Sequence, residues 1–122
     1  MTTPFNQPVN PSQPIRWFGA SGRTYDMYLD PIWSTYLPRS GVYIFCRQIA
    51  AAQWGAVYVG ETDDFRRRLT DNLTLHHRWE SIRAAGATDI CTLHVSNDYG
   101  GTLRLAIEAD LRHALNPPCN RQ

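Results

Sequence analysis

The sequence predicts a small α/β (α+β) domain in which helices flank a three-stranded central sheet and an N-terminal β-hairpin forms an extension. Aromatic and β-branched residues are concentrated in three short runs, at 42–45, 56–59 and 89–95, as is typical of strands. Apolar residues recur at helical spacing over 103–115, which predicts an amphipathic helix. A chain of 122 residues, 43% of them hydrophobic, has the size of one compact domain.

The chain before the central sheet divides into two parts. Residues 1–14 hold four prolines and several polar residues, so we expect a flexible lead. Two β-prone runs, 15–18 and 24–29, flank a glycine-containing turn and predict a hairpin packed on the edge of the main domain. We therefore assign 15–40 to the hairpin extension and 41–122 to the main domain.

The elements of the main domain are expected in the order β, β, α, α, β, α. Thr62 or Asp63 can cap the first helix, because a short oxygen-bearing side chain accepts from the unpaired amides of its first turn. Gly86 suits the end of the second helix, and Pro117 and Pro118 prevent the last helix from continuing. The expected strands are 41–47, 54–60 and 89–95. The first expected helix carries Phe65, Arg68, Leu69 and Asn72, the second spans about 75–85, and the last spans 103–115 with Thr102 as its cap.

The chain holds 12 arginines and no lysine. The formal net charge is only +1, so a nucleic-acid contact must come from local clustering and not from a broad basic surface. Arginine grips phosphate well but is a poor general base, so any base must be Tyr, His, Asp or Glu. The cysteines, Cys46, Cys91 and Cys119, form no CxxC pair, which argues against a disulfide framework and a zinc site.

The sequence shows neither a secretory signal nor a membrane span. Residues 1–13 lack the basic start and the apolar run of a signal peptide, and no stretch approaches the roughly 20 apolar residues of a spanning helix. We expect a cytoplasmic protein with no membrane partner.

Two tyrosines and a triple arginine indicate a phosphate-binding site. Tyr43 and Tyr58 fall in the first two predicted strands, and 66–68 is an uninterrupted run of arginine directly after the second strand. Phenol hydroxyls beside guanidinium groups offer the donors that a phosphate requires.

Glu108, in the last predicted helix, has two interpretations. It lies at the border of the apolar stripe, one turn from both Arg104 and Arg112, so it can be a solvated partner of either. Alternatively, its carboxylate is aimed at the strands that carry the tyrosines. One such oxygen ligand, completed by water and substrate phosphate, would suffice for Mg²⁺.

Five elements of the chain stand in a specific order. The tripeptides Gly41-Val42-Tyr43 and Tyr58-Val59-Gly60 are followed by Arg68, eight residues after the second tripeptide, then by Glu108 and Asn120. In this order the chain resembles the GIY-YIG nuclease superfamily from about residue 41 to residue 120. The resemblance selects Arg68 from the three consecutive arginines.

The resemblance implies a GIY-YIG endonuclease-like fold and a metal-dependent endonuclease that hydrolyses DNA phosphodiester bonds by in-line attack of water. It implies that Glu108 holds a single Mg²⁺ (or Mn²⁺), which polarises the scissile phosphate. Arg68 then offsets charge on the phosphoryl oxygens. Tyr43 orients or deprotonates the attacking water, and Tyr58 holds the phosphate or a water.

Further contacts to nucleic acid are expected around these residues. Two positions depart from the family pattern: Glu61 stands where many relatives have a basic residue, and Asn72 where several have His or Tyr. His76 or His77 could replace a missing base by folding back, or either can be an ordinary histidine at the start of the second helix. The expected nucleic-acid contacts are Arg66, Arg67, Asn72, His76, Arg78 and Asn120.

The acidic stretch that begins at Glu61 supports a second hypothesis. A GIY-YIG-like domain could bind nucleic acid or a protein partner without cleaving, since Glu61, Asp63 and Asp64 would repel a phosphate unless they are neutralised. The sequence leaves open the strand form of the DNA, the use of RNA and the oligomeric state.

Overall fold

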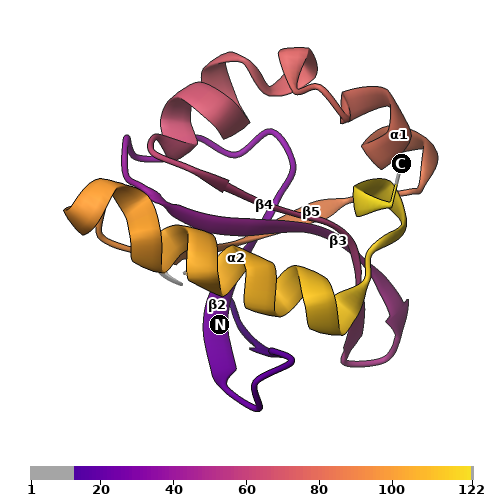
Figure 1. Ribbon diagram of the computed structural model, residues 1–122. Helices are drawn as coiled ribbons and strands as arrows, with labels where there is room; N and C mark the ends of the chain where they lie inside the picture. Colours follow the sequence, from indigo (N-terminus) through magenta and orange to yellow (C-terminus); the bar gives the residue numbers. More distant parts are fainter. Residues whose placement is uncertain (1–12, 122) are drawn as a thin grey trace, which may run out of the picture.

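A computed structural model describes residues 13–121 and shows one five-stranded sheet (Figure 1). Every pairing between its strands is antiparallel, and their spatial order is β1-β2-β5-β3-β4. The expected lead lies almost entirely outside the described residues. The strands are β1 (Gln13–Phe18), β2 (Thr24–Pro31), β3 (Gly41–Ala50), β4 (Gln53–Thr62) and β5 (Asp89–His94).

The prediction of a small three-stranded central sheet is wrong, because the N-terminal hairpin belongs to the same sheet. β2 pairs antiparallel with β5, placing Tyr28 opposite Thr92 and Leu29 opposite Cys91. Met27 and Leu29 then point to the same apolar face as Cys91, and all three are buried. The local pattern indicates a hairpin but not its partner about 60 residues away, because register is fixed by burial of the shared face.

Different helical layers cover the two faces of the sheet (Figure 1). One face carries an irregular connection between β4 and β5, and the other carries α2 (Thr102–Leu115). The C-terminal 3₁₀ turn, Pro118–Asn120, returns past the β4 edge, because Cys119 packs in the cluster beneath the irregular connection. The irregular connection contains a π-helical segment (Arg67–Asp71), a 3₁₀ turn (Leu73–Leu75) and α1 (Trp79–Ala84).

The irregular connection departs from the two helices that the sequence predicts there. The first helix is wound mostly as a π-helix, with the Asn72 amide donating to the Arg67 carbonyl. The second begins at Trp79 and not at 75, because His76 has extended backbone angles (φ −57°, ψ 133°). The His76 side chain is buried against aromatic rings of the sheet, which fixes this break. The last helix ends at Leu115 as expected but includes Thr102, the residue expected to cap it, and its N-cap is Gly101.

Alternation along β3 divides the core between the two faces. Tyr43 and Phe45 point toward the irregular connection, whereas Val42 and Ile44 point toward α2, and all four are fully buried. Each such side chain stabilises the fold by roughly 1.5–3 kcal/mol through removal from water. Tyr43 is therefore a core residue as well as a member of the predicted site.

The helical segments of residues 13–121 do not reach the length and apolarity that a membrane-spanning helix needs.

Candidate functional site

The two motif tyrosines lie side by side on the face beneath the irregular connection. Their rings, on the adjacent strands β3 and β4, have centroids 6.2 Å apart. Gly60 pairs directly opposite Tyr43, and a Cβ built on Gly60 would lie 2.4 Å from Tyr43 Cζ. Gly60 therefore makes room for the Tyr43 ring over the backbone of β4.

The other motif glycine, Gly41, has a similar structural reason. A Cβ there would lie 2.1 Å from the Leu93 carbonyl oxygen and 2.4 Å from Phe65 Cζ. Phe65 is buried and leads into the π-helical segment that carries Arg67 and Arg68. The first tripeptide thus brings that segment close to the sheet.

The Tyr43 hydroxyl accepts two hydrogen bonds. Arg68 Nη1 donates to it at 3.3 Å, and His76 Nε2 lies 2.8 Å away. His76 Nδ1 accepts from the Arg78 amide at 3.0 Å, so the proton of a neutral imidazole is assigned to Nε2. Both neighbours are then donors, so neither of them accepts the Tyr43 O–H proton.

Burial keeps this cluster neutral apart from Arg68. It raises the pKa of Tyr43, and the nearby Arg68 charge opposes that rise without cancelling it. It also lowers the pKa of His76 to about 4. At neutral pH Tyr43 is a phenol and His76 a neutral imidazole.

Tyr58 lies at the rim of the same cluster. Its ring packs edge-on against His76 at 5.1 Å, and its hydroxyl lies 3.5 Å from His77 Nε2. Burial, and after it the negative charge of Glu108, raise the pKa of Tyr58. Tyr58 therefore stands between the histidines and α2.

Glu108 of α2 reaches this rim as a partly buried carboxylate whose side chain is 14% exposed. Arg112 Nη1 lies 3.4 Å from its Oε2. Burial raises the pKa of Glu108, Arg112 opposes this rise and Glu61 adds to it. Of the two predicted partners, Arg112 contacts Glu108, whereas Arg104 turns elsewhere.

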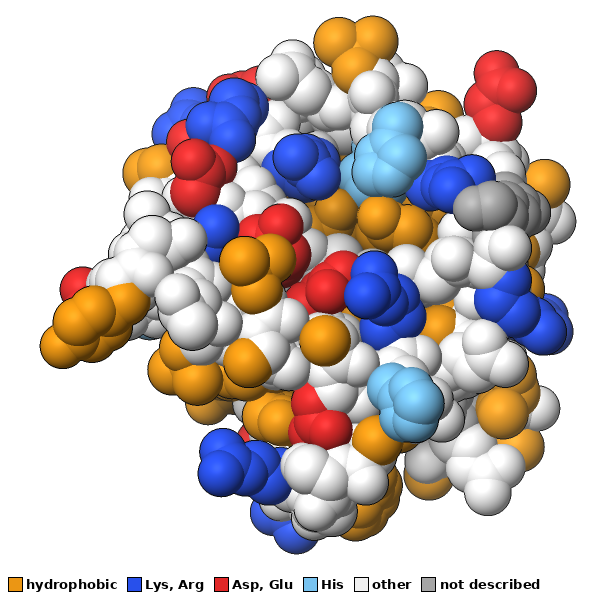
Figure 2. All heavy atoms as spheres, viewed as in Figure 1, with side chains coloured by type: hydrophobic (Ala, Val, Ile, Leu, Met, Phe, Trp, Pro, Cys, Tyr) orange, Lys and Arg blue, Asp and Glu red, His pale blue; other side chains and the backbone are white. Residues whose placement is uncertain are grey.

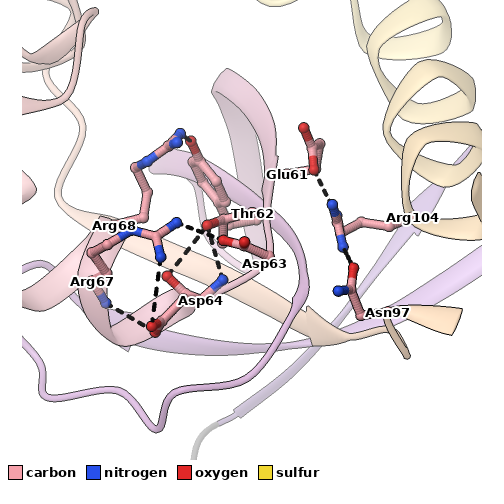
Figure 3. A network of polar contacts seen from close by, with 9 residues as sticks. Glu61, Thr62, Asp63, Asp64, Arg67, Arg68, Asn97 and Arg104 are labelled. Carbon is pink, nitrogen blue, oxygen red and sulfur yellow. Dashed lines mark hydrogen bonds and ion pairs between the residues drawn. The ribbon is translucent and has the colours of Figure 1, made fainter. Parts of the chain in front are cut away.

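Arg104 neutralises the acidic residue that follows the second tripeptide (Figure 3). Its Nε donates to Glu61 Oε1 at 2.6 Å, and its Nη1 donates to Asn97 Oδ1. Arg104 is buried, and the Gly101 backbone packs against its guanidinium. The spacing of Arg104 and Glu108 indicated that Arg104 pairs with a carboxylate. It did not indicate that this carboxylate is Glu61.

The three consecutive arginines turn to different partners, as Figure 3 shows for Arg67 and Arg68. Arg67 bonds Asp63 at 2.5 Å and lies 3.8 Å from Asp64, and Arg66 lies 3.9 Å from Asp71. Asp64, and not Thr62 or Asp63, accepts from the Arg67 amide in the first helical turn, at 3.0 Å. The expected DNA contacts Arg66 and Arg67 are thus exposed but ion-paired, while the third arginine turns to Tyr43.

Some of the other predicted contacts converge and others do not. Asn72 and His76 line a pocket of about 310 Å³ together with Arg67, Arg68, Leu75 and His77. Asn120 instead bonds the β4 edge, since its Oδ1 accepts from the Val59 amide and its Nδ2 donates to the Val59 carbonyl. The charge of Arg78 acts on Tyr58 and both histidines.

The oxygen donors fit a magnesium ion held by one protein carboxylate. Glu108 is partly buried with one long contact to a cation, whereas Glu61 is occupied by Arg104. Within 13–121, no three His, Cys, Asp or Glu side chains gather as a metal cage. Mg²⁺ is compatible with a single carboxylate when phosphate and water complete its octahedron.

Basic and histidine side chains surround an apolar floor on the face of Figure 2, with acidic side chains among them. This arrangement offers donors for a phosphate and one carboxylate for a cation within a small area.

Comparisons of the chain with protein-family models, with curated proteins and with solved structures found no match.

Proposed function

We propose that the protein is a GIY-YIG endonuclease that hydrolyses DNA phosphodiester bonds with one Mg²⁺ (or Mn²⁺) on Glu108. The observation that supports this most is the placement of Arg68. Of three consecutive arginines it is the one whose guanidinium donates to Tyr43, while Arg66 and Arg67 lie against carboxylates. A catalytic site that needs one guanidinium beside one phenol would explain why Arg68, and not Arg66 or Arg67, contacts Tyr43.

Arg68 and the tyrosines would bind and orient the reacting groups. The guanidinium of Arg68 presents further N–H donors to phosphoryl oxygens, where negative charge increases during displacement. Tyr58, at the rim, would hold the phosphate or a water through its hydroxyl. When bound at Glu108, the metal ion would polarise the phosphate and stabilise the departing 3′ oxygen.

Tyr43 would position the attacking water through its hydroxyl group. To accept a proton from that water it must first become a phenolate, and burial opposes this by raising its pKa. Arg68 and His76 are the two donors that would stabilise the phenolate. Cleavage should therefore increase with pH through neutrality.

A domain that binds nucleic acid without cleaving is the second candidate. Two observations favour it: the Tyr43 side chain is fully buried, and the Glu108 carboxylate already has a cationic partner in Arg112. Both groups would have to change partners before they could reach a substrate.

Cleavage assays on plasmid, single-stranded and branched DNA, with Mg²⁺ or Mn²⁺, separate the two candidates. We expect metal-dependent cleavage of at least one substrate by the natural chain and loss of it in Glu108→Gln. Glu80→Gln, which changes an exposed carboxylate of α1, is the matched control and should cleave normally. Binding without cleavage on every substrate would favour the second candidate.

A further inference from the structure

Arg104, Glu108 and Arg112 occupy one stripe of α2, one turn apart. The Arg104 side chain is 10% exposed and holds Glu61 at 2.6 Å. Arg112 is 51% exposed and reaches Glu108 only at 3.4 Å. One arginine of the stripe is therefore fixed in the fold, and the other is held loosely at the surface.

Arg112 also borders a second cleft, of about 600 Å³, on the flank of α2. The side chains that line this cleft include two guanidinium groups and no carboxylate. Asn120 forms part of the wall of this cleft, because hydrogen bonds to the Val59 backbone hold its side-chain amide. The lining residues are Ala109, Arg112, His113, Asn116, Asn120 and Arg121.

The charge of this cleft suits an anion that is bound by side chains. It lies at the carbonyl end of α2, where the helix dipole is unfavourable for anions, so any anion there must be held by Arg112 and Arg121. Since Arg112 contacts Glu108 as well, the cleft adjoins the carboxylate of the proposed metal site. A nucleic-acid strand with its scissile phosphate beside Glu108 would carry a neighbouring backbone phosphate past this cleft.

We propose that the cleft binds a backbone phosphate next to the scissile one, and that Arg112 turns to this phosphate when Glu108 binds a divalent cation. The inference rests on the proposed function. A guanidinium and a divalent cation compete for the same carboxylate and repel each other, so Glu108 exchanges one for the other. Once released, Arg112 can bind an anion, and the bound strand supplies one.

The inference predicts opposite effects of one substitution on two ligands. Arg112→Gln removes the competitor of the cation, so Mn²⁺ alone should bind roughly 3- to 10-fold more tightly. The same change removes a phosphate contact, so DNA should bind roughly 3- to 10-fold more weakly, with a salt slope smaller by about 0.7–0.9. Arg121→Gln should weaken DNA binding alone.

Two equilibrium measurements on the full chain test this. Mn²⁺ affinity is measured by electron paramagnetic resonance without DNA. Affinity for labelled single-stranded and duplex oligonucleotides is measured by fluorescence anisotropy in Ca²⁺ at several salt concentrations. Arg112→Lys should retain both natural behaviours. Arg23→Gln, an equal charge change by the opposite flank of α2, should alter neither affinity.

The outcomes distinguish this inference from the proposed function. Unchanged or weaker Mn²⁺ binding in Arg112→Gln, while Glu108→Gln abolishes it, would overturn the exchange and leave the metal site intact. Unchanged DNA affinity in both Arg112→Gln and Arg121→Gln would show that the cleft does not bind a backbone phosphate. Mn²⁺ binding that survives Glu108→Gln would instead contradict the metal site of the proposed function. It would also contradict the exchange of Arg112 for a cation at Glu108.

Discussion

The two helical layers of this protein differ in regularity, although both contribute to the candidate site. α2 is a continuous helix of 14 residues that supplies Glu108. The connection over the other face changes from π-helix to 3₁₀ turn to α-helix within 18 residues, 67–84, and supplies Arg68 and His76. One of its breaks falls at His76, which contacts the Tyr43 hydroxyl, and Arg68 donates to the same hydroxyl from within the π-helical segment. Packing against Tyr43 therefore shapes this layer more strongly than helix propensity does.

The largest expected effect comes from filling the space that Gly60 leaves for Tyr43. Gly60→Ala would place a Cβ 2.4 Å from Tyr43 Cζ and displace the ring on which the irregular layer rests. We expect a loss of about 3 kcal/mol or more in the free energy of unfolding, measured by urea denaturation. Gly55→Ala, also on β4, is the control, because the nearest atom to its Cβ would be Cγ2 of the exposed Ile49 side chain, at 3.0 Å. Equal losses in both variants would contradict this role of Gly60.

The next largest effect is a pH dependence that belongs to the irregular layer. Burial lowers the pKa of His76 to about 4, whereas the unfolded chain should titrate near 6.5. A folded pKa below the unfolded one means that His76 stabilises the fold above about pH 6.5. This stability is lost as the pH falls toward 4. The loss should be on the order of 2–3 kcal/mol.

Urea denaturation at pH 7 and pH 4 measures this loss directly. The decrease between the two pH values should be clearly smaller in His76→Gln than in the natural chain. His94→Gln, which changes an exposed histidine of β5, should leave it unchanged. A decrease that is the same in all three proteins would show that His76 does not titrate with folding.

The smallest expected effect compares the two tyrosines. Tyr43→Phe leaves the N–H groups of Arg68 and His76 without their common acceptor and should cost about 1–2 kcal/mol. Tyr58→Phe removes one contact at 3.5 Å and should cost less than about 0.5 kcal/mol. Chemical denaturation of both variants measures the difference in the free energy of unfolding. A larger loss for Tyr58→Phe would contradict the assignment of the Tyr43 hydroxyl as the more important buried acceptor.

The sequence predicted the elements whose residues pack by a regular period. The apolar stripe of 102–115 and the β-branched runs around Tyr43 and Tyr58 are local signals, and these elements form where expected. The pairing of β2 with β5 is not local, so the extent of the sheet was predicted wrongly. No local pattern reports a partner distant in sequence.

The candidate site was predictable in part for the same reason. The resemblance to the GIY-YIG family selected Arg68 and Glu108; in the structure the first donates to Tyr43, and the second lies near enough to Tyr58 for its charge to raise the pKa of that phenol. The role of His76 was one of two open alternatives, because it depends on a break in a predicted helix. The pairing of Glu61 with Arg104 spans 43 residues, so adjacent acidic residues alone did not reveal it.

We propose that Arg68 alone of the three consecutive arginines serves the chemistry, whereas Arg66 and Arg67 lie against carboxylates. DNA cleavage by Arg68→Gln and Arg66→Gln in Mg²⁺ tests this most directly, because the variants carry the same charge change two residues apart. We expect Arg68→Gln to lower the cleavage rate by roughly 100-fold or more, as removal of a transition-state donor does, and Arg66→Gln to stay within about threefold. Equal rates in the two variants, or metal-dependent cleavage that survives Arg68→Gln, would contradict the claim.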